Sequence, residues 1–195
     1  MKKVDFEIPD GNLEYYPDFL SLSQADKAFN FLMNAEVWRQ DKIKMFGKEI
    51  LQPRLTVLFG EVGKSYKYSG LEMHPIPFPE ELKEIKEKCQ SSPLNTEFNV
   101  CLANLYRDGS DSMGWHADDE KELGINPIIA SISLGAERVF HLKHKKIQTA
   151  RQKIRLQHGS LLIMKGTTQE FWKHQLPKSK KVDSPRVNLT FRNIY

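Results

Sequence analysis

The sequence has little of what defines several large classes of protein. No apolar run approaches the roughly 20 residues of a membrane-spanning helix. The first residues, MKKVDFEIPD, follow their lysines with acidic residues and a proline instead of the apolar segment of a signal peptide. We therefore expect a soluble, intracellular protein with no membrane partner, cytoplasmic if the source is bacterial and nuclear if it is eukaryotic.

Cysteine is also scarce, since the chain has only Cys89 and Cys101 and no CxxC spacing. Two cysteines are too few for a disulfide framework, so we expect reduced, packed thiols. No internal repeat, low-complexity tract or linker is present. With 195 residues, 39% hydrophobic and 28% charged, the chain is neither disordered nor fibrous, and its length predicts a single domain over 1–195.

Two segments carry the signals of amphipathic helices. Ser21 or Ser23 can cap a helix whose apolar residues recur at helical spacing, namely Ala25, Ala28, Phe29, Leu32 and Met33. A second helix is expected to begin near Pro79, with glutamates in its opening turns and Leu82, Ile85 and Cys89 on one face.

From Thr96 to the end, short apolar runs alternate with Gly, Asn, Asp and Pro. The expected strands are FNVCLANLYR, NPIIASISLG, ERVFHLKHK, GSLLIMKG and PRVNLTFRNIY. Successive strands without helices between them indicate an antiparallel sandwich or barrel.

An apolar hairpin tip is expected nearer the amino terminus. Gly47, between IKMF and KEIL, predicts a turn with Met45 and Phe46 near the tip. Lysines 42, 44 and 48 surround these residues. Such a tip either packs on a neighbouring segment or inserts into something negatively charged.

A metal site is suggested by the HxD pair His116 and Asp118 together with the distant His174. Two imidazoles and one carboxylate can occupy one face of an octahedral ion, as in non-haem Fe(II) oxygenases. A zinc site would want a fourth protein ligand, which His158 could supply, or a hydrolytic water. The spacing alone therefore leaves the metal open.

An anion site is suggested by the last expected strand. Strict alternation places Arg186, Asn188, Thr190 and Arg192 on one face of it. Two arginines on one face favour an anion with two carboxylates, because a guanidinium pairs bidentately with a carboxylate. Asn104 and Tyr106 share a face of the earlier strand and add hydrogen-bonding groups.

Together, the NLY segment, the HxD pair, His174 and the RVNLTFR ending resemble the AlkB-type Fe(II)/2-oxoglutarate dioxygenases, which repair alkylated nucleic acid. The likeness runs from about Lys42 to Tyr195, and KMFGK, QPR and SYKYSG look closest to the AlkB homologue 2 subgroup, which acts on duplex DNA. The resemblance implies a mainly β fold with flanking helices, a jelly-roll. Its core would span 96–195, and a nucleotide-recognition lid with the hairpin would span 36–72.

The same resemblance implies the site. Fe(II) would be held by His116, Asp118 and His174, and O2 would be a cosubstrate. The distal carboxylate of 2-oxoglutarate would meet Arg186 and Tyr106, and the carboxylate at the metal would lie near Arg192 and Asn104. The implied reaction removes N-methyl groups from 1-methyladenine and 3-methylcytosine in DNA as formaldehyde, coupled to decarboxylation of 2-oxoglutarate to succinate and carbon dioxide.

An enzyme that reaches a methyl group on a paired base edge must extrude the nucleotide. By resemblance, Phe46 would fill the vacated stack, Met45 and Gly47 would flank it, and Tyr68 and His116 would sandwich the flipped base. Tyr66, Ser69 and Arg54 would belong to the surrounding nucleic-acid surface, and Glu120 would contact the exocyclic amine of the base. We expect a monomer that prefers duplex DNA and can also accept a single strand.

The charge distribution agrees with a nucleic-acid partner. No Asp or Glu lies between Arg138 and Gln169, a segment that contains eight cationic residues: Arg138, Lys143, Lys145, Lys146, Arg151, Lys153, Arg155 and Lys165. Lys178, Lys180 and Lys181 form a second basic cluster. Such blocks suit phosphate binding or are simply solvated loops. Two other functions stay open, a dioxygenase of the same fold that acts on RNA or protein, and a nucleic-acid-binding module without catalysis.

Overall fold

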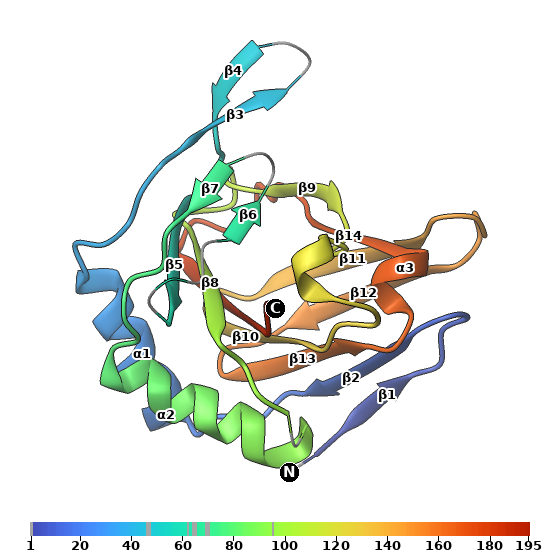
Figure 1. Cartoon of the computed structure of the whole chain (residues 1–195), viewed down its shortest axis with the longest axis horizontal. Helices are drawn as coiled ribbons and strands as arrows, with labels where there is room; N and C mark the ends of the chain where they lie inside the picture. Colours follow the sequence, from blue (N-terminus) through green and yellow to red (C-terminus); the bar gives the residue numbers. More distant parts are fainter. Residues whose placement is uncertain (1, 46–47, 62, 64–65, 69–70, 95) are drawn as a thin grey trace.

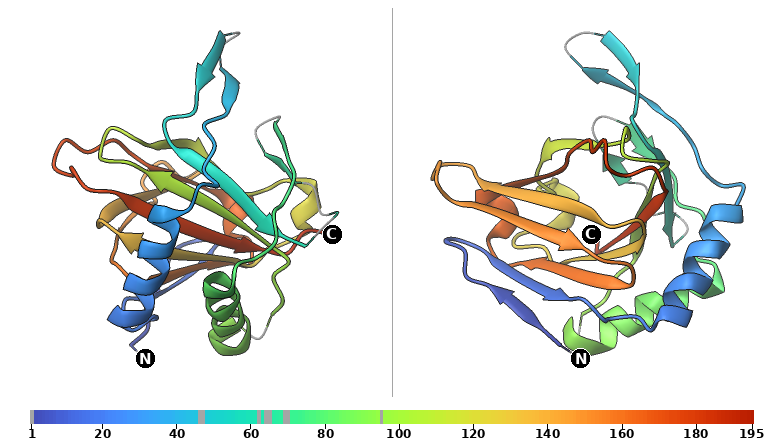
Figure 2. Two further views of the ribbon diagram at one scale, coloured as in Figure 1. Left: turned by 90° about the vertical axis from the view of Figure 1, so that its left-hand side faces the viewer. Right: turned by 180° about the vertical axis from the view of Figure 1, so that it is seen from behind.

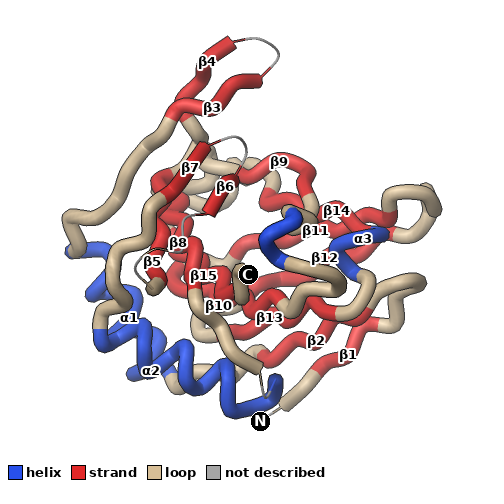
Figure 3. Tube along the Cα trace, viewed as in Figure 1, coloured by secondary structure: helices blue, strands red, loops and turns tan. Residues whose placement is uncertain are grey.

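Two antiparallel sheets dominate the computed structural model, which describes residues 2–45, 48–61, 63, 66–68, 71–94 and 96–195 (Figures 1 and 3). The large sheet has the order β1-β2-β13-β10-β15-β8-β5 and the small sheet β12-β11-β14-β9. The strands of the large sheet are β1 (Val4–Phe6), β2 (Asn12–Tyr16), β5 (Leu55–Gly60), β8 (Val100–Tyr106), β10 (Ile129–Gly135), β13 (Ser160–Lys165) and β15 (Arg186–Arg192). Those of the small sheet are β9 (Met113–His116), β11 (Arg138–His144), β12 (Arg151–Leu156) and β14 (Trp172–Leu176).

Helices cover the outer face of the large sheet (Figure 2). They are α1 (Leu22–Asn34) and α2 (Glu80–Cys89), which continues into the π-helical turn η1 (Gln90–Leu94). The short helix α3 (Thr168–Phe171) and the 3-10 turn η2 (Lys121–Leu123) lie in connections. The molecule therefore has three layers, with the large sheet in the middle.

Alternation along the central strands supplies both layers of the core. In β15, Val187, Leu189 and Phe191 pack with Leu32 of α1 and Leu82 of α2. The second core lies between the sheets and contains Leu102, Ile129 and Leu162 of the large sheet with Leu142, Ile154 and Trp172 of the small one. Because successive side chains of a strand point to opposite faces, the large sheet can serve both cores.

The five predicted strands are confirmed as β8, β10, β11, β13 and β15, and both helices begin where their caps predict. The other three strands of the small sheet, β9, β12 and β14, were not predicted from the sequence. In β12, RQKIRL, the basic residues mask an alternating pattern, and β9 and β14 are short segments around the two histidines His116 and His174. Both cysteines are free and buried, as expected, and burial raises the pKa of each thiol.

Two small hairpins stand apart from the sandwich on one side of the molecule (Figure 1). One joins β3 (Lys42–Met45) to β4 (Lys48–Leu51), as predicted around Gly47, and the other joins β6 (Tyr66–Tyr68) to β7 (Leu71–Met73). The assignment of 36–72 as a lid stays a prediction, as does the single-domain boundary 1–195. None of the helices in the described part of the chain is long and apolar enough to cross a membrane.

We expect Ser21→Ala to lower the free energy of unfolding by about 1 kcal/mol. Ser21 Oγ accepts a hydrogen bond from the Gln24 N–H at 3.2 Å, and Gln24 Oε1 accepts one from the Ser21 N–H at 3.1 Å. Both bonds of this capping box depend on Ser21 standing just before the helix. The matched control is Ser23→Ala inside the first turn, which should leave urea denaturation unchanged. Equal stability of the two variants would contradict the cap assignment.

Candidate metal centre

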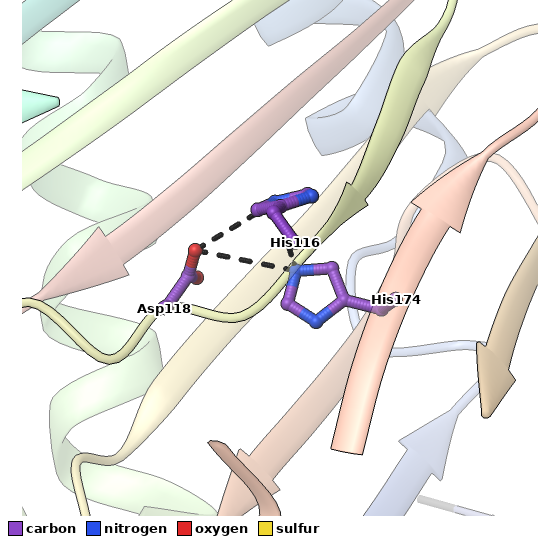
Figure 4. Close-up of side chains that lie close together, drawn as sticks. All are labelled: His116, Asp118 and His174. Carbon is purple, nitrogen blue, oxygen red and sulfur yellow. Dashed lines mark hydrogen bonds and ion pairs between the residues drawn. The ribbon is translucent and has the colours of Figure 1, made fainter. Parts of the chain in front are cut away.

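Three predicted ligands converge between the two sheets (Figure 4). His116 ends β9, Asp118 follows two residues later, and His174 lies on β14, where it pairs directly opposite His116. The two Nε2 atoms are 3.0 Å apart, and Asp118 Oδ1 lies 3.7 Å from His116 Nε2 and 4.0 Å from His174 Nε2. The three donor atoms thus face one common point.

The protonation states suit a divalent cation. Burial lowers the pKa of His174 to about 3, with a further contribution from His116, and burial also lowers the pKa of His116. Burial alone would raise the pKa of Asp118, but Arg192 and the two imidazoles outweigh it and hold that pKa well below its usual range. At neutral pH the site therefore offers two neutral nitrogens and one carboxylate.

Neighbouring groups orient each ligand. The carbonyl oxygen of Gly114 lies 2.8 Å from His116 Nδ1, which therefore carries the proton and leaves the Nε2 lone pair for a metal. The Asp118 N–H donates to Gln169 Oε1 of α3 at 2.9 Å, and Arg192 Nη2 donates to Asp118 Oδ2 at 2.8 Å. Asp118 Oδ1 has no hydrogen-bond partner among the described residues. A buried, unsatisfied carboxylate oxygen facing two imidazoles is what a metal ion would complete.

His158 does not belong to this group. Its Nδ1 accepts a hydrogen bond from the Gly135 N–H at 2.8 Å, and its Nε2 lies 3.2 Å from Asp26 Oδ1 on α1. Among the described residues, the only cluster of three or more His, Cys, Asp or Glu side chains able to hold a metal is the His116, Asp118 and His174 group. The fourth protein ligand that a closed zinc site needs is therefore missing from the described part of the chain.

A pocket extends from these ligands along the inner face of the large sheet. Arg186 and Arg192 on β15 line it, as do Asn104 and Tyr106 on β8. Asn188 and Thr190 also face it, as the alternation of β15 predicts, while Ser131 and Phe140 line it without any signal in the sequence. The pocket therefore has a metal-ligand end and an arginine end.

Arg186 forms the arginine end. It is 2% exposed, its Nη2 donates to Ser133 Oγ at 2.9 Å, and its Nε has no hydrogen-bond partner among the described residues. Its Cζ lies 5.5 Å from the centre of the ring of Tyr106, the residue opposite Arg186 in the pairing of β8 with β15. Burial lowers the pKa of Arg186 to about 10, so the group is still a cation at neutral pH. A buried cation with an unused donor suits a carboxylate.

Arg54 lies in the interior, although the resemblance places it on the nucleic-acid surface. It is 3% exposed, and its Nε donates to Asn104 Oδ1 at 2.7 Å. Because a guanidinium only donates, this bond orients the amide of Asn104. Any contact of Arg54 with substrate stays a prediction.

The other predicted nucleic-acid contacts are only partly visible. Glu120 is half-buried just before η2. Phe46, Gly47 and Ser69 lie outside the described residues, and only the backbone of Met45, Tyr66 and Tyr68 is described. Their roles stay predictions.

The basic block between Arg138 and Gln169 is not one phosphate-binding surface. Arg138 is 2% exposed, so the expectation that it faces phosphates is wrong. Lys165 pairs with the buried carboxylate of Glu14 at 2.7 Å, and Lys145 pairs with Asp119 at 3.1 Å. A run of like charges in the sequence thus separates into buried, paired and exposed groups once β11, β12 and β13 form.

A sandwich with a two-histidine, one-carboxylate site and an adjoining arginine pocket is the architecture of a non-haem iron oxygenase. Residues 12–192 match the family model described as 2OG-Fe(II) oxygenase superfamily, and the chain belongs to this family. The predictions of a jelly-roll that is mainly β with flanking helices, and of Fe(II), 2-oxoglutarate and O2 as its cofactor and cosubstrates, are thereby confirmed.

Curated relatives support the AlkB-type resemblance. The chain is 41% identical over 189 residues to human alpha-ketoglutarate-dependent dioxygenase alkB homolog 3, covering 92% of this chain and 65% of that protein. It is 39% identical over 189 residues to mouse DNA oxidative demethylase ALKBH2, covering 92% of this chain and 79% of the relative. The chain thus spans about two thirds of the length of the alkB homolog 3 proteins. The solved structure of OsALKBH1 shares the fold, with a TM-score of 0.65 at 18% identity, over 97% of this chain and 100% of that one.

We expect Gln169→Met to weaken Co(II) binding about tenfold, because groups that orient a ligand typically contribute this much to metal affinity. Gln169 is buried at 1% exposure and accepts the Asp118 N–H, so its loss frees the segment that carries this ligand. The measurement is a titration with Co(II), monitored by the visible absorption of the bound ion. Gln175→Met on the opposite face of β14 is the control, and equal affinities of the two variants would refute this role.

Proposed function

We propose that this protein is an Fe(II)- and 2-oxoglutarate-dependent enzyme that removes N-linked methyl groups from damaged bases of DNA. The observation that carries the proposal is that His116, Asp118 and His174 converge at one end of a pocket that is also lined by the buried, partly unsatisfied guanidinium of Arg186. A bound ferrous ion would supply the oxidising power for hydroxylation of the methyl group, with O2 as the oxidant and 2-oxoglutarate converted to succinate and carbon dioxide; the hydroxylated methyl group is then released as formaldehyde.

The residues of the chain would divide the work between the two ends of the pocket. Arg186, beside Tyr106, would hold the distal carboxylate of 2-oxoglutarate, because it is a buried cation with an unused Nε donor. Asn104 would donate a hydrogen bond to the carboxylate of 2-oxoglutarate that lies at the metal, and Arg54 would orient the amide of Asn104. Arg192 holds Asp118 ionised and in place for the metal through its 2.8 Å bond to Oδ2.

DNA as the substrate class is supported by the relatives, one of which is named a DNA oxidative demethylase. Within DNA we propose 1-methyladenine and 3-methylcytosine in a duplex, with a monomer as the active form. A methylated pairing edge weakens the base pair, so extruding the nucleotide costs least at the lesion. Phe46 would occupy the vacated stack from the connection between β3 and β4, with Met45 and Gly47 beside it.

Further contacts with the extruded base are proposed from the same resemblance. Tyr68 would stack on one side of the base opposite His116, and Glu120 would accept a hydrogen bond from its exocyclic amine. Tyr66 and Ser69 would contact the neighbouring nucleic acid. Mass spectrometry of methylated duplex DNA, RNA and peptide, incubated in parallel with iron, ascorbate and 2-oxoglutarate, tests the substrate class.

We expect His174→Ala to abolish demethylation, because removal of one imidazole leaves only one nitrogen and one carboxylate for the metal. The readout is loss of the methyl mass from a 1-methyladenine oligonucleotide together with succinate formation. His141→Ala is the control, since His141 lies on β11 on the opposite sheet face from Leu142, which pairs with His174. Retained succinate formation coupled to demethylation in His174→Ala would overturn the assignment.

For Phe46→Ala, we expect duplex repair to fall about tenfold and single-strand repair to change little. Filling a vacated stack offsets an unstacking cost of a few kcal/mol, which arises only in a duplex. The comparison is kcat/KM on duplex and single-stranded oligonucleotides with the same lesion. Leu51→Ala, an apolar residue 54% exposed on the same hairpin, is the control. Equal losses on both substrates would remove the wedge role.

A further inference from the structure

Arg138 is a buried cation whose hydrogen bonds all go to backbone carbonyls. Its Nη1 donates to the Asp108 oxygen at 3.0 Å, and its Nη2 donates to the oxygens of Asp111 at 3.0 Å and Pro177 at 2.7 Å. None of the ion pairs found among the described residues includes it. Arg138 therefore joins two connections, 107–112 between β8 and β9 and 177–185 between β14 and β15.

These two connections are also joined directly and run side by side (Figure 2). The Gly109 N–H donates to the Val182 oxygen at 2.8 Å, and the Ser179 N–H donates to the Gly109 oxygen at 2.8 Å. A Cβ at Gly109 would lie 2.6 Å from the Val182 oxygen and would collide with the Ser179 oxygen. Only glycine allows this close approach, so the pairing of the two loops depends on both Arg138 and Gly109.

The second loop carries an exposed cationic group. Lys178, Lys180 and Lys181 are all exposed, and Asp183 is the acidic residue of the same loop. The other loop adds one net negative charge, since it contains Arg107, Asp108 and Asp111. Asp111 is bound by Arg107 Nε at 2.8 Å, and Asp108 Oδ1 accepts a hydrogen bond from the Ser110 N–H at 2.7 Å. The lysine loop therefore remains the cationic part of the pair and is suited to backbone phosphates, provided that it is held in place.

The loop pair also abuts the arginine end of the pocket. Two guanidinium groups lie near the Tyr106 ring, with Arg138 Cζ at 6.0 Å and Arg186 Cζ at 5.5 Å from its centre. One loop begins directly after Tyr106 and the other ends directly before Arg186, so Arg138 fixes both loops next to residues that line the pocket. The planar guanidinium reaches three carbonyls in two segments, which a lysine ammonium cannot reproduce.

We propose that Arg138 is a positioning residue for nucleic-acid binding, which holds the loop of Lys178, Lys180 and Lys181 against the arginine end of the pocket so that these lysines meet the phosphates of the substrate. This inference rests on the proposed function, because it takes the substrate to be a nucleic acid. It replaces direct phosphate contact by Arg138 with an indirect role.

The test measures how the affinity for an unmodified DNA duplex depends on KCl, by fluorescence anisotropy and without turnover. The slope of log K against log salt is negative, and each lost phosphate contact reduces its magnitude by about 0.9. Arg138→Lys keeps the charge, so the magnitude of the slope should decrease by about 1 to 2 only if the loop is displaced. Lys180→Ala combined with Lys181→Ala should decrease it equally. The triple variant should show no further loss, since Arg138 acts through these lysines.

Arg155→Lys, at an exposed position of the same small sheet, is the matched control and should retain the wild-type slope. Gly109→Ala is a second variant that separates the loops without touching Arg138, and it should reproduce the loss if Arg138→Lys does not fold. Circular dichroism reports the folded fraction of each variant. A wild-type slope in folded Arg138→Lys or Gly109→Ala, or additive losses in the triple variant, would overturn the inference.

The proposed function fails by a different result, a wild-type protein that leaves 1-methyladenine intact. Binding and repair are measured separately, so either idea can fail alone. A wild-type protein without salt-dependent affinity for the duplex would overturn the positioning role whatever its repair activity.

Discussion

The site depends on one buried ion pair, between Arg192 Nη2 and Asp118 Oδ2 at 2.8 Å. Asp118 is 1% exposed, and a carboxylate so deeply buried is ionised only if nearby charge compensates its loss of hydration. Arg192 comes from the large sheet, while His116 and His174 come from the small sheet, so the pair ties the two layers together at the metal ligands. Without it, the second carboxylate oxygen could not be held, charged, toward the two imidazoles.

The large sheet combines packing and chemistry through alternation. Val187, Leu189 and Phe191 are buried against the helices, and the residues between them face the pocket. A change on the helix face of β15 would therefore displace the arginines on its other face. The helices α1 and α2 share a core cluster with the apolar face of the strand that carries both arginines.

Much of this organisation was predictable from local pattern. The β15 alternation, the Ser21 cap and the HxD pair each depend on residues close in sequence, and each is found in the structure. Strand β12 was hidden because charged residues occupy its outward positions, and the contact of Gln169 with Asp118 joins α3 to a segment 51 residues away. The expected nucleic-acid contacts at Phe46, Gly47 and Ser69 fall outside the described residues, so these roles stay predictions.

The sequence by itself determined the residue types, the local elements and the family resemblance, because these depend on short-range periodicity and on motifs a few residues long. Only the tertiary structure decided that His174 joins His116 while His158 binds Gly135 and Asp26. It also decided that Arg138 and Arg54, residue types that are usually exposed, are interior groups. The physical reason is that these outcomes depend on the pairing of strands far apart in the chain, whose register no local pattern specifies.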